Sequence, residues 1–127
     1  EALAPALPLP DFPLTRFTRI EAGEPFFRMR ECAGVPNAQT RIDVIERQGA
    51  IWRYALHPVS GRKHQLRVHM AALGLPLRND PFYPVVNDSA EGDYSRPLQL
   101  LARSLEFADP LTGEQRAFES RQMLVLP

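Results

Sequence analysis

The side chains with the clearest chemical potential are concentrated between positions 60 and 77, where the chain reads SGRKHQLRVHMAALGLPL. The cationic and titratable residues in this stretch are Arg62, Lys63, His64, Arg67 and His69. The formal net charge of the chain is zero, yet no Asp or Glu occurs from position 47 to position 79. Arginine and lysine bind phosphates and carboxylates, so we expect this stretch to face an anion.

A helix is predicted over about residues 62–73. Apolar side chains recur at helical spacing at Leu66, Met70 and Leu73. Gly74 is a natural stop, and Ser60 is placed to cap the first turn. Such a helix would point its unpaired N–H groups and positive dipole end toward Arg62, Lys63 and His64. This predicts a phosphate-type anion at the helix start, with an exposed start that binds nothing as the alternative.

Arg67 lies one turn further along, at the border of the apolar ridge. A half-buried arginine needs a carboxylate or a phosphate as its partner. Spacing alone leaves open whether this partner is functional or structural, and favours a structural one.

Other kinds of site fail on spacing. His64 and His69 are five residues apart, about 140° around a helix, whereas a helical zinc pair is four apart, so no metal site is predicted. Ser60 lacks the G-x-S-x-G context of a hydrolase nucleophile. Asp80 and Asp109 each precede a proline, which favours Asx-turn hydrogen bonding over catalysis.

Aromatic residues are interleaved with the basic stretch. They are Trp52, Tyr54, Phe82 and Tyr83. They could stack on unpaired bases, or they could pack in a core, which Trp52 and Tyr54 on one strand face suit equally well.

The elements around this stretch predict an α+β fold: a mainly antiparallel mixed sheet with one main helix. Strands are expected at 14–21, 26–31, 40–47, 51–59, 98–107 and 116–126, with a hairpin turn at QGA. The apolar stretch 98–107 is expected to be a buried strand, although its pattern also permits a helix. The proline-rich residues 1–13 are expected to be a connector that leads into a folded part, 14–127.

Composition limits the class of protein. No apolar run approaches the ~20 residues of a membrane span, and no signal peptide is evident. Cys32 is the single cysteine, which fits a reducing compartment, so we expect a cytoplasmic protein without a membrane partner.

The segment SGRKHQLRVHMAALGLPLRNDPFYP resembles the T-G-R-x-H-Q-[IL]-R-V-H-x-x-x-x-G-x-P-[IL]-x-G-D-x-x-Y segment of the RluA-type pseudouridine synthases. NAQTRIDVIERQGAIWRYALHPV is similar to the strand pair before it, and LQLLARSLEFADPLTGEQRAFES to the closing hairpin. The resemblance covers about residues 14–122 and implies the C-terminal part, or half, of a pseudouridine synthase catalytic domain.

The family isomerises uridine to pseudouridine in ribosomal or transfer RNA, without a cofactor. An aspartate attacks the nucleoside, and the base detaches, rotates and bonds again through carbon. By resemblance, Arg67 forms the ion pair with this aspartate, and Arg62, Lys63, His64 and Gln65 face the RNA. Metal ligands are not implied.

The chain departs from the family pattern. Leu101 stands where the family usually has histidine, and the aspartate segment H-R-L-D-x-x-T-S-G is not in the sequence. We expect a missing N-terminal part of the same domain to supply the aspartate, and this chain to be inactive alone. The alternatives are a non-catalytic RNA-binding module on the same scaffold, or a structural domain whose Arg67 pairs internally.

Overall fold

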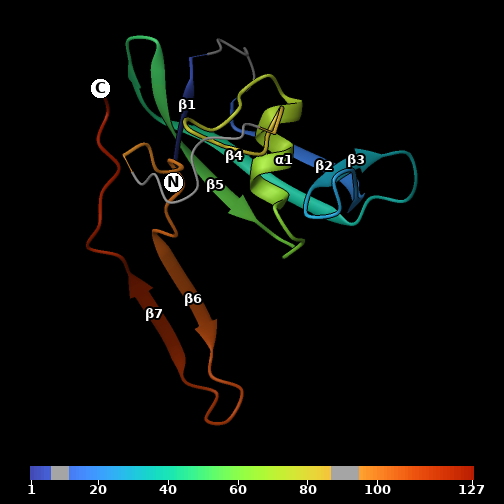
Figure 1. The fold of residues 1–127 in the computed structure, drawn as a ribbon. Helices are drawn as coiled ribbons and strands as arrows, with labels where there is room; N and C mark the ends of the chain where they lie inside the picture. The colour runs from blue at the N-terminus through green and yellow to red at the C-terminus, as the bar shows by residue number, and fades with distance from the viewer. Residues whose placement is uncertain (7–11, 87–94) are drawn as a thin grey trace.

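A curved five-stranded antiparallel sheet forms the body of the molecule in the computed structural model, which describes residues 1–6, 12–86 and 95–127 (Figure 1). The strands are β1 (Ala2–Pro5), β2 (Leu14–Ala22), β3 (Met29–Cys32), β4 (Ala38–Gln48) and β5 (Ile51–Pro58), in the order β1-β5-β4-β2-β3. The helix α1 (Gln65–Ala72) and a second sheet, the hairpin of β6 (Ser104–Ala108) and β7 (Gln115–Glu119), complete the described elements. The predicted α+β class, with an antiparallel sheet and one main helix, is confirmed.

The β4–β5 hairpin is the centre of the sheet and follows the predicted pattern. Ile42 pairs with Leu56 and Val44 with Tyr54, so apolar side chains share the face that packs inward. Gly49, in the QGA turn, has a φ of 64°, which glycine adopts without steric cost.

The connector predicted for residues 1–13 is wrong at its N-terminal end. Residues 2–5 form β1, which pairs with β5 in the register Ala2↔Tyr54 to Pro5↔Ile51. Ala2, Leu3 and Ala4 have no exposed surface. In sequence, small apolar residues next to prolines are typical of a linker. In the structure, residues 2–5 lie between β5 and the chain near Leu100 and pack into the core. Residues 7–11 of the predicted connector lie outside the described residues.

The helix begins three residues later than predicted, at Gln65, and Ser60 does not cap it. His64 occupies the cap position with a left-handed φ of 56°, and the cap makes no side-chain hydrogen bond. The Ser60 hydroxyl instead accepts from the backbone N–H of Gln39 and donates to the side chain of Gln65. Residues 60–64 therefore form a loop tied to β4.

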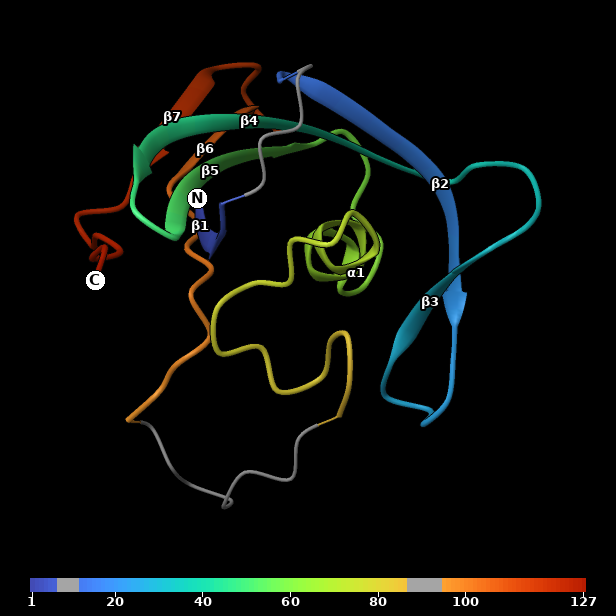
Figure 2. The same cartoon turned by 90° about the horizontal axis from the view of Figure 1, so that it is seen from above.

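The core lies where the curved sheet arches over α1 and the loop that follows it (Figure 2). Its largest fully buried side chains include Leu3, Ile42, Tyr54, Met70 and Leu75. A second cluster joins Ile20, Ala38, Val68 and Tyr83. The buried helix residues are Gln65, Val68, His69 and Met70, so the predicted apolar ridge is only partly correct: polar side chains take part in the contact with the sheet.

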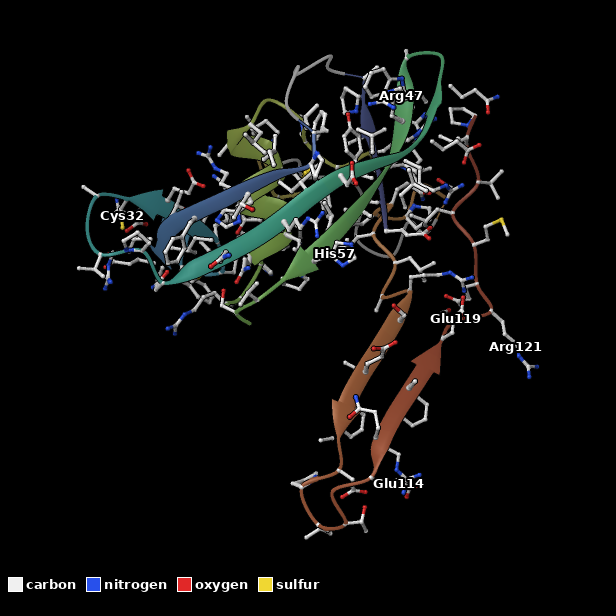
Figure 3. The ribbon with its side chains drawn as sticks, turned by 180° about the vertical axis from the view of Figure 1, so that it is seen from behind. Cys32, Arg47, His57, Glu114, Glu119 and Arg121 are labelled. Carbon is white, nitrogen blue, oxygen red and sulfur yellow. The ribbon has the colours of Figure 1, made fainter. Side chains whose placement is uncertain are left out.

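The β6–β7 hairpin extends away from the main sheet (Figure 3). The prediction of a buried strand at 98–107 is wrong, because the described strand is Ser104–Ala108 and all its residues are exposed. The last predicted strand, 116–126, is observed only at Gln115–Glu119. Asp109 accepts from the backbone N–H groups of Leu111 and Thr112, which confirms its predicted turn role. Among the described residues, no helix is both long and apolar enough to cross a membrane.

Candidate active site

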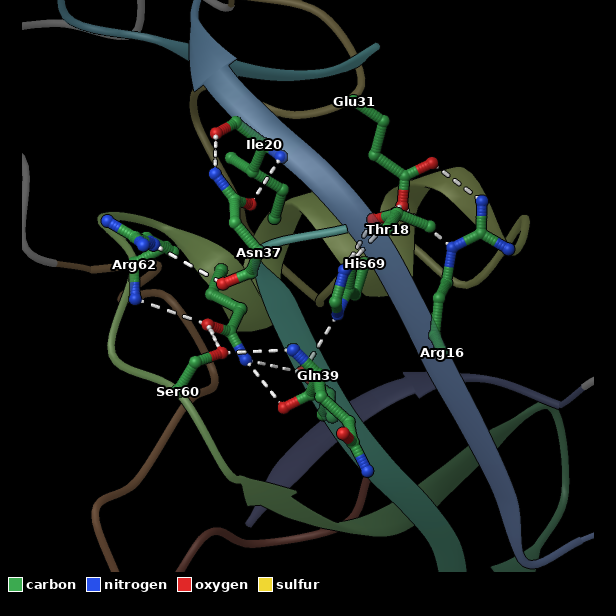
Figure 4. A network of polar contacts seen from close by, with 11 residues as sticks. Arg16, Thr18, Ile20, Glu31, Asn37, Gln39, Ser60, Arg62 and His69 are labelled. Atoms are coloured by element: carbon green, nitrogen blue, oxygen red, sulfur yellow. Dashed lines mark hydrogen bonds and ion pairs between the residues drawn. The ribbon is translucent and has the colours of Figure 1, made fainter. Parts of the chain in front are cut away.

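Gln65 anchors the basic loop 60–64 to the sheet through contacts with Ser60, Arg62 and Gln39, which are labelled in Figure 4. Its side-chain oxygen accepts from the Ser60 hydroxyl (2.8 Å) and from the Arg62 backbone N–H (3.2 Å). Its amide nitrogen donates to the Gln39 carbonyl and to the Thr40 hydroxyl, both at 2.9 Å. The residue is only 3% exposed. Its amide is therefore used inside the protein, which fixes the loop against β4.

This anchoring leaves the cations of the loop outside. Arg62 and Lys63 are exposed. The Arg62 guanidinium reaches the Asn37 carbonyl at 3.3 Å, and the Asn37 side chain is itself held by both backbone polar groups of Ile20. Arg62 thus lies over the chain that connects β3 to β4, with most of its donors turned to solvent.

His64 faces the loop after α1. Its Nδ1 atom is 2.9 Å from the Tyr83 hydroxyl, and that hydroxyl accepts from the Met29 N–H at 2.7 Å. Burial lowers the pKa of His64, and the positive charges of Arg67 and Lys63 lower it further. The imidazole is therefore neutral at pH 7 and links the basic loop to Tyr83.

Arg67 forms a bidentate ion pair with Asp80. Its Nε and Nη2 atoms donate to the two carboxylate oxygens at 3.0 and 2.6 Å. The Asp80 side chain is 1% exposed and that of Arg67 is 12% exposed. The guanidinium also lies over the rings of Phe82 (4.8 Å) and Tyr83 (5.3 Å). The requirement of Arg67 for an anion, predicted from sequence, is met here inside the chain.

Asp80 combines this pair with the predicted Asx turn. Its Oδ1 atom accepts from the backbone N–H groups of Phe82 (2.9 Å) and Tyr83 (3.3 Å). The turn fixes the carboxylate, and the carboxylate fixes the Arg67 guanidinium. Sequence reasoning missed this second role, although Asp80 is the first carboxylate after the acid-free stretch that ends at Asn79.

One edge of the Arg67 guanidinium stays available. Within the ranges that the structure describes, the Nη1 atom of Arg67 makes no hydrogen bond. It is also not fully buried, because the fully buried atoms without a partner do not include it. A guanidinium has five N–H donors arranged in a planar fork. Asp80 therefore orients Arg67 while leaving donors for a second anion.

A buried polar network lies on the other side of α1. His69, with no exposed surface, makes 2.8 Å hydrogen bonds to the Thr40 and Thr18 hydroxyls. Thr18 donates to Glu31, which forms a bidentate pair with Arg16. Burial lowers the pKa of His69 despite the nearby Glu31 carboxylate. This network joins the helix to β2, β3 and β4, and no sequence pattern signals it.

His64 and His69 thus have separate partners, and the described residues contain no group of His, Cys, Asp or Glu side chains arranged to hold a metal. Tyr54 is fully buried, and Trp52 packs partly against the same core. The core interpretation of these two rings is confirmed, whereas Phe82 and Tyr83 surround Arg67.

Comparison with known proteins finds relatives over much of the chain. The family model of RNA pseudouridylate synthase matches residues 9–72. The dual-specificity RNA pseudouridine synthase RluA of Haemophilus influenzae is 39% identical over 85 residues, 66% of this chain and 37% of that protein. The RluA protein of Pasteurella multocida is 37% identical over 101 residues, 79% of this chain and 39% of that protein.

A solved structure shares the fold. Human RNA pseudouridylate synthase domain containing 1 superposes with a TM-score of 0.68 and 24% identity, covering 95% of this chain and 52% of that one. The chain spans about two fifths of the length of the curated relatives named above. Because the family model matches half of the chain, and because the RluA proteins match a larger part of it, the chain belongs to the RluA-type RNA pseudouridine synthase family.

Proposed function

We propose that this chain is the arginine-bearing part of an RNA pseudouridine synthase catalytic domain, which isomerises uridine to pseudouridine in structured ribosomal or transfer RNA. The observation that carries the proposal is the geometry of Arg67, held on one edge by Asp80 and stacked on two aromatic rings. A cation so constrained is suited to position a second carboxylate at the remaining donors.

The second carboxylate is the nucleophilic aspartate of the H-R-L-D segment. A guanidinium beside this carboxylate keeps it ionised and orients it, as attack on a nucleoside requires. The 127 residues contain no such segment, so another part of the same domain supplies it. Accordingly, the chain on its own is inactive. As the family resemblance implies, we propose that the reaction needs no cofactor.

The RNA-facing surface is the loop 60–64. Arg62 and Lys63 are exposed cations that can contact phosphates, and His64 lies between them and Arg67. Gln65 holds this surface in position. Its side-chain amide is already hydrogen-bonded to Ser60, Gln39 and Thr40. The partners of the chain are thus RNA and the remainder of its domain.

The Arg67–Asp80 pair also supports a second candidate, a non-catalytic RNA-binding module on the same scaffold. In that protein Arg67 has Asp80 as its only anionic partner, and the RNA is bound by the basic loop alone. This candidate requires that no aspartate segment belongs to the parent protein.

The test is release of tritium from RNA that carries 5-tritiated uridine. The isolated chain should release none, and the chain joined to an upstream segment with an H-R-L-D-like motif should release it catalytically. Product from the isolated chain would contradict its inactivity. RNA binding by the isolated chain, together with a parent protein that has no H-R-L-D-like segment, would favour the non-catalytic module.

A further inference from the structure

The connection between β2 and β3 presents an aromatic ring that the proposed site does not use. Phe26 is 87% exposed. It contacts Phe27 edge to face at 5.7 Å, and Phe27 lies 5.0 Å from Phe82, the ring beneath Arg67. A continuous series of rings therefore leads from the surface to the arginine of the proposed active site.

A hollow of about 470 Å³ opens beside this connection. It is lined by Ala22, Gly23, Glu24, Arg28, Met29 and Arg30. Its volume lies in the range of about 300–1,000 Å³ that is typical of small-ligand sites. One carboxylate and two guanidinium groups give it both acceptors and donors, which match the edge of a nucleobase better than a bare phosphate.

Arg28 connects the hollow to the active-site loop. Its Nη2 atom donates to the Pro84 carbonyl at 2.9 Å, and its guanidinium lies 4.9 Å from the centre of the Tyr83 ring. Its Nε atom is buried and has no hydrogen-bond partner among the described residues. Arg28 is thus fixed at the boundary between the hollow and the rings around Arg67, with one donor unsatisfied.

We propose that the tip of the β2–β3 hairpin binds an unpaired nucleobase that flanks the target uridine, stacked on Phe26, with its edge in the hollow formed by Glu24, Arg28 and Arg30. This inference rests on the proposed function and adds a single-strand specificity to it. Exposed aromatic rings beside cations are the common means by which proteins bind unpaired bases. Charge complementarity selects RNA over an apolar protein segment as the occupant.

The test is fluorescence anisotropy with a labelled 12-nucleotide single-stranded RNA and the same RNA annealed to its complement. Phe26→Ala should weaken single-strand binding about 5- to 150-fold and leave duplex binding unchanged. Phe26→Trp should retain binding, and its added emission should be quenched by the stacked base. Leu111→Ala is the matched control, since Leu111 is 94% exposed at the β6–β7 turn, and its RNA affinity should equal that of the wild type.

The outcomes separate this inference from the proposed function. If Phe26→Ala binds both RNAs within twofold of wild type while Lys63→Ala weakens them, the hairpin site is wrong and the RNA-facing loop stands. Equal weakening on both RNAs overturns base stacking. If the wild-type chain binds neither RNA, the RNA-binding part of the proposed function fails, and the hairpin site fails with it.

Discussion

Replacing Asp80 by asparagine should separate the two roles of this carboxylate. The amide oxygen can still accept from the Phe82 and Tyr83 N–H groups, so the turn is kept. The amide nitrogen replaces the oxygen that now accepts from Arg67 Nε at 3.0 Å, so two donors face each other. Arg67 is left as a mostly buried cation without its counter-ion.

The magnitude follows from the burial of the pair. Removing one partner of a buried ion pair costs about 3–5 kcal/mol, and one hydrogen bond to a charged group is worth about 1.5–3 kcal/mol. Arg67 keeps 12% exposure and can be partly solvated, so Asp80→Asn should cost about 2–4 kcal/mol. Arg67→Met should cost more, about 3–5 kcal/mol, because the Asp80 carboxylate is 1% exposed.

Urea unfolding followed by circular dichroism at pH 7 measures these losses, and the double variant completes a thermodynamic cycle. A coupling energy of about 1–3 kcal/mol is expected between the two sites. Glu114→Gln, at an exposed pair with Arg116, is the control and should cost less than about 1 kcal/mol. If Asp80→Asn costs no more than this control, and if the losses of Asp80→Asn and Arg67→Met simply add in the double variant, Asp80 does not hold Arg67.

Three further outcomes are expected. Burial lowers the pKa of His69 in the folded chain, so below about pH 6.5 the unfolded chain binds a proton that the folded chain does not. The free energy of unfolding should therefore be highest above about pH 6.5 and should fall as the pH drops below it. Urea midpoints measured against pH, and an NMR titration of the His69 imidazole with its midpoint below pH 6.5, check this. Gln65→Leu should lower the free energy of unfolding in urea by about 1–3 kcal/mol, because Thr40 and Gln39 lose their hydrogen bonds to Gln65. It should also weaken RNA binding, because the basic loop is no longer held against β4. An unchanged RNA affinity would show that the position of the loop does not control RNA binding. Ile42→Ala should lower the free energy of unfolding by about 2–5 kcal/mol, because Ile42 has no exposed surface. Phe118→Ala should lower it by less than about 1 kcal/mol, because Phe118 is 57% exposed. Equal losses for the two variants would contradict this assignment of the core.

The local elements could be predicted from sequence where one periodicity decided them. Residues 38–58 alternate apolar and polar side chains around a glycine turn, so the β4–β5 hairpin was predicted within a few residues. The strand at residues 2–5 was not predicted, because it is defined by pairing with β5, about 50 residues away in the sequence. The apolar residues near position 100 suggested a buried strand, but the observed strand is exposed. The spacing of apolar residues does not show whether another element packs against a hairpin.

The site was predicted in its chemistry and missed in its contacts. Sequence showed that Arg67 lies at the edge of the buried face and needs an anion. The identity of that anion depends on the path of residues 74–80, which returns Asp80 to the helix. In the same way, Gln65 and His69 lie on the buried side of α1 because Thr40, on the neighbouring strand, offers them a polar partner. The contacts of Arg62, Lys63 and His64 with RNA stay predictions.

The most direct test of the account is the single-turnover rate of pseudouridine formation by the joined protein with Arg67→Lys. Lysine keeps the charge but loses the planar fork that serves Asp80 and a second carboxylate together. We predict a rate loss of about 100-fold or more with RNA affinity within twofold of wild type. A rate within twofold of wild type would contradict the assignment of Arg67 to the nucleophilic aspartate and leave it as the internal partner of Asp80.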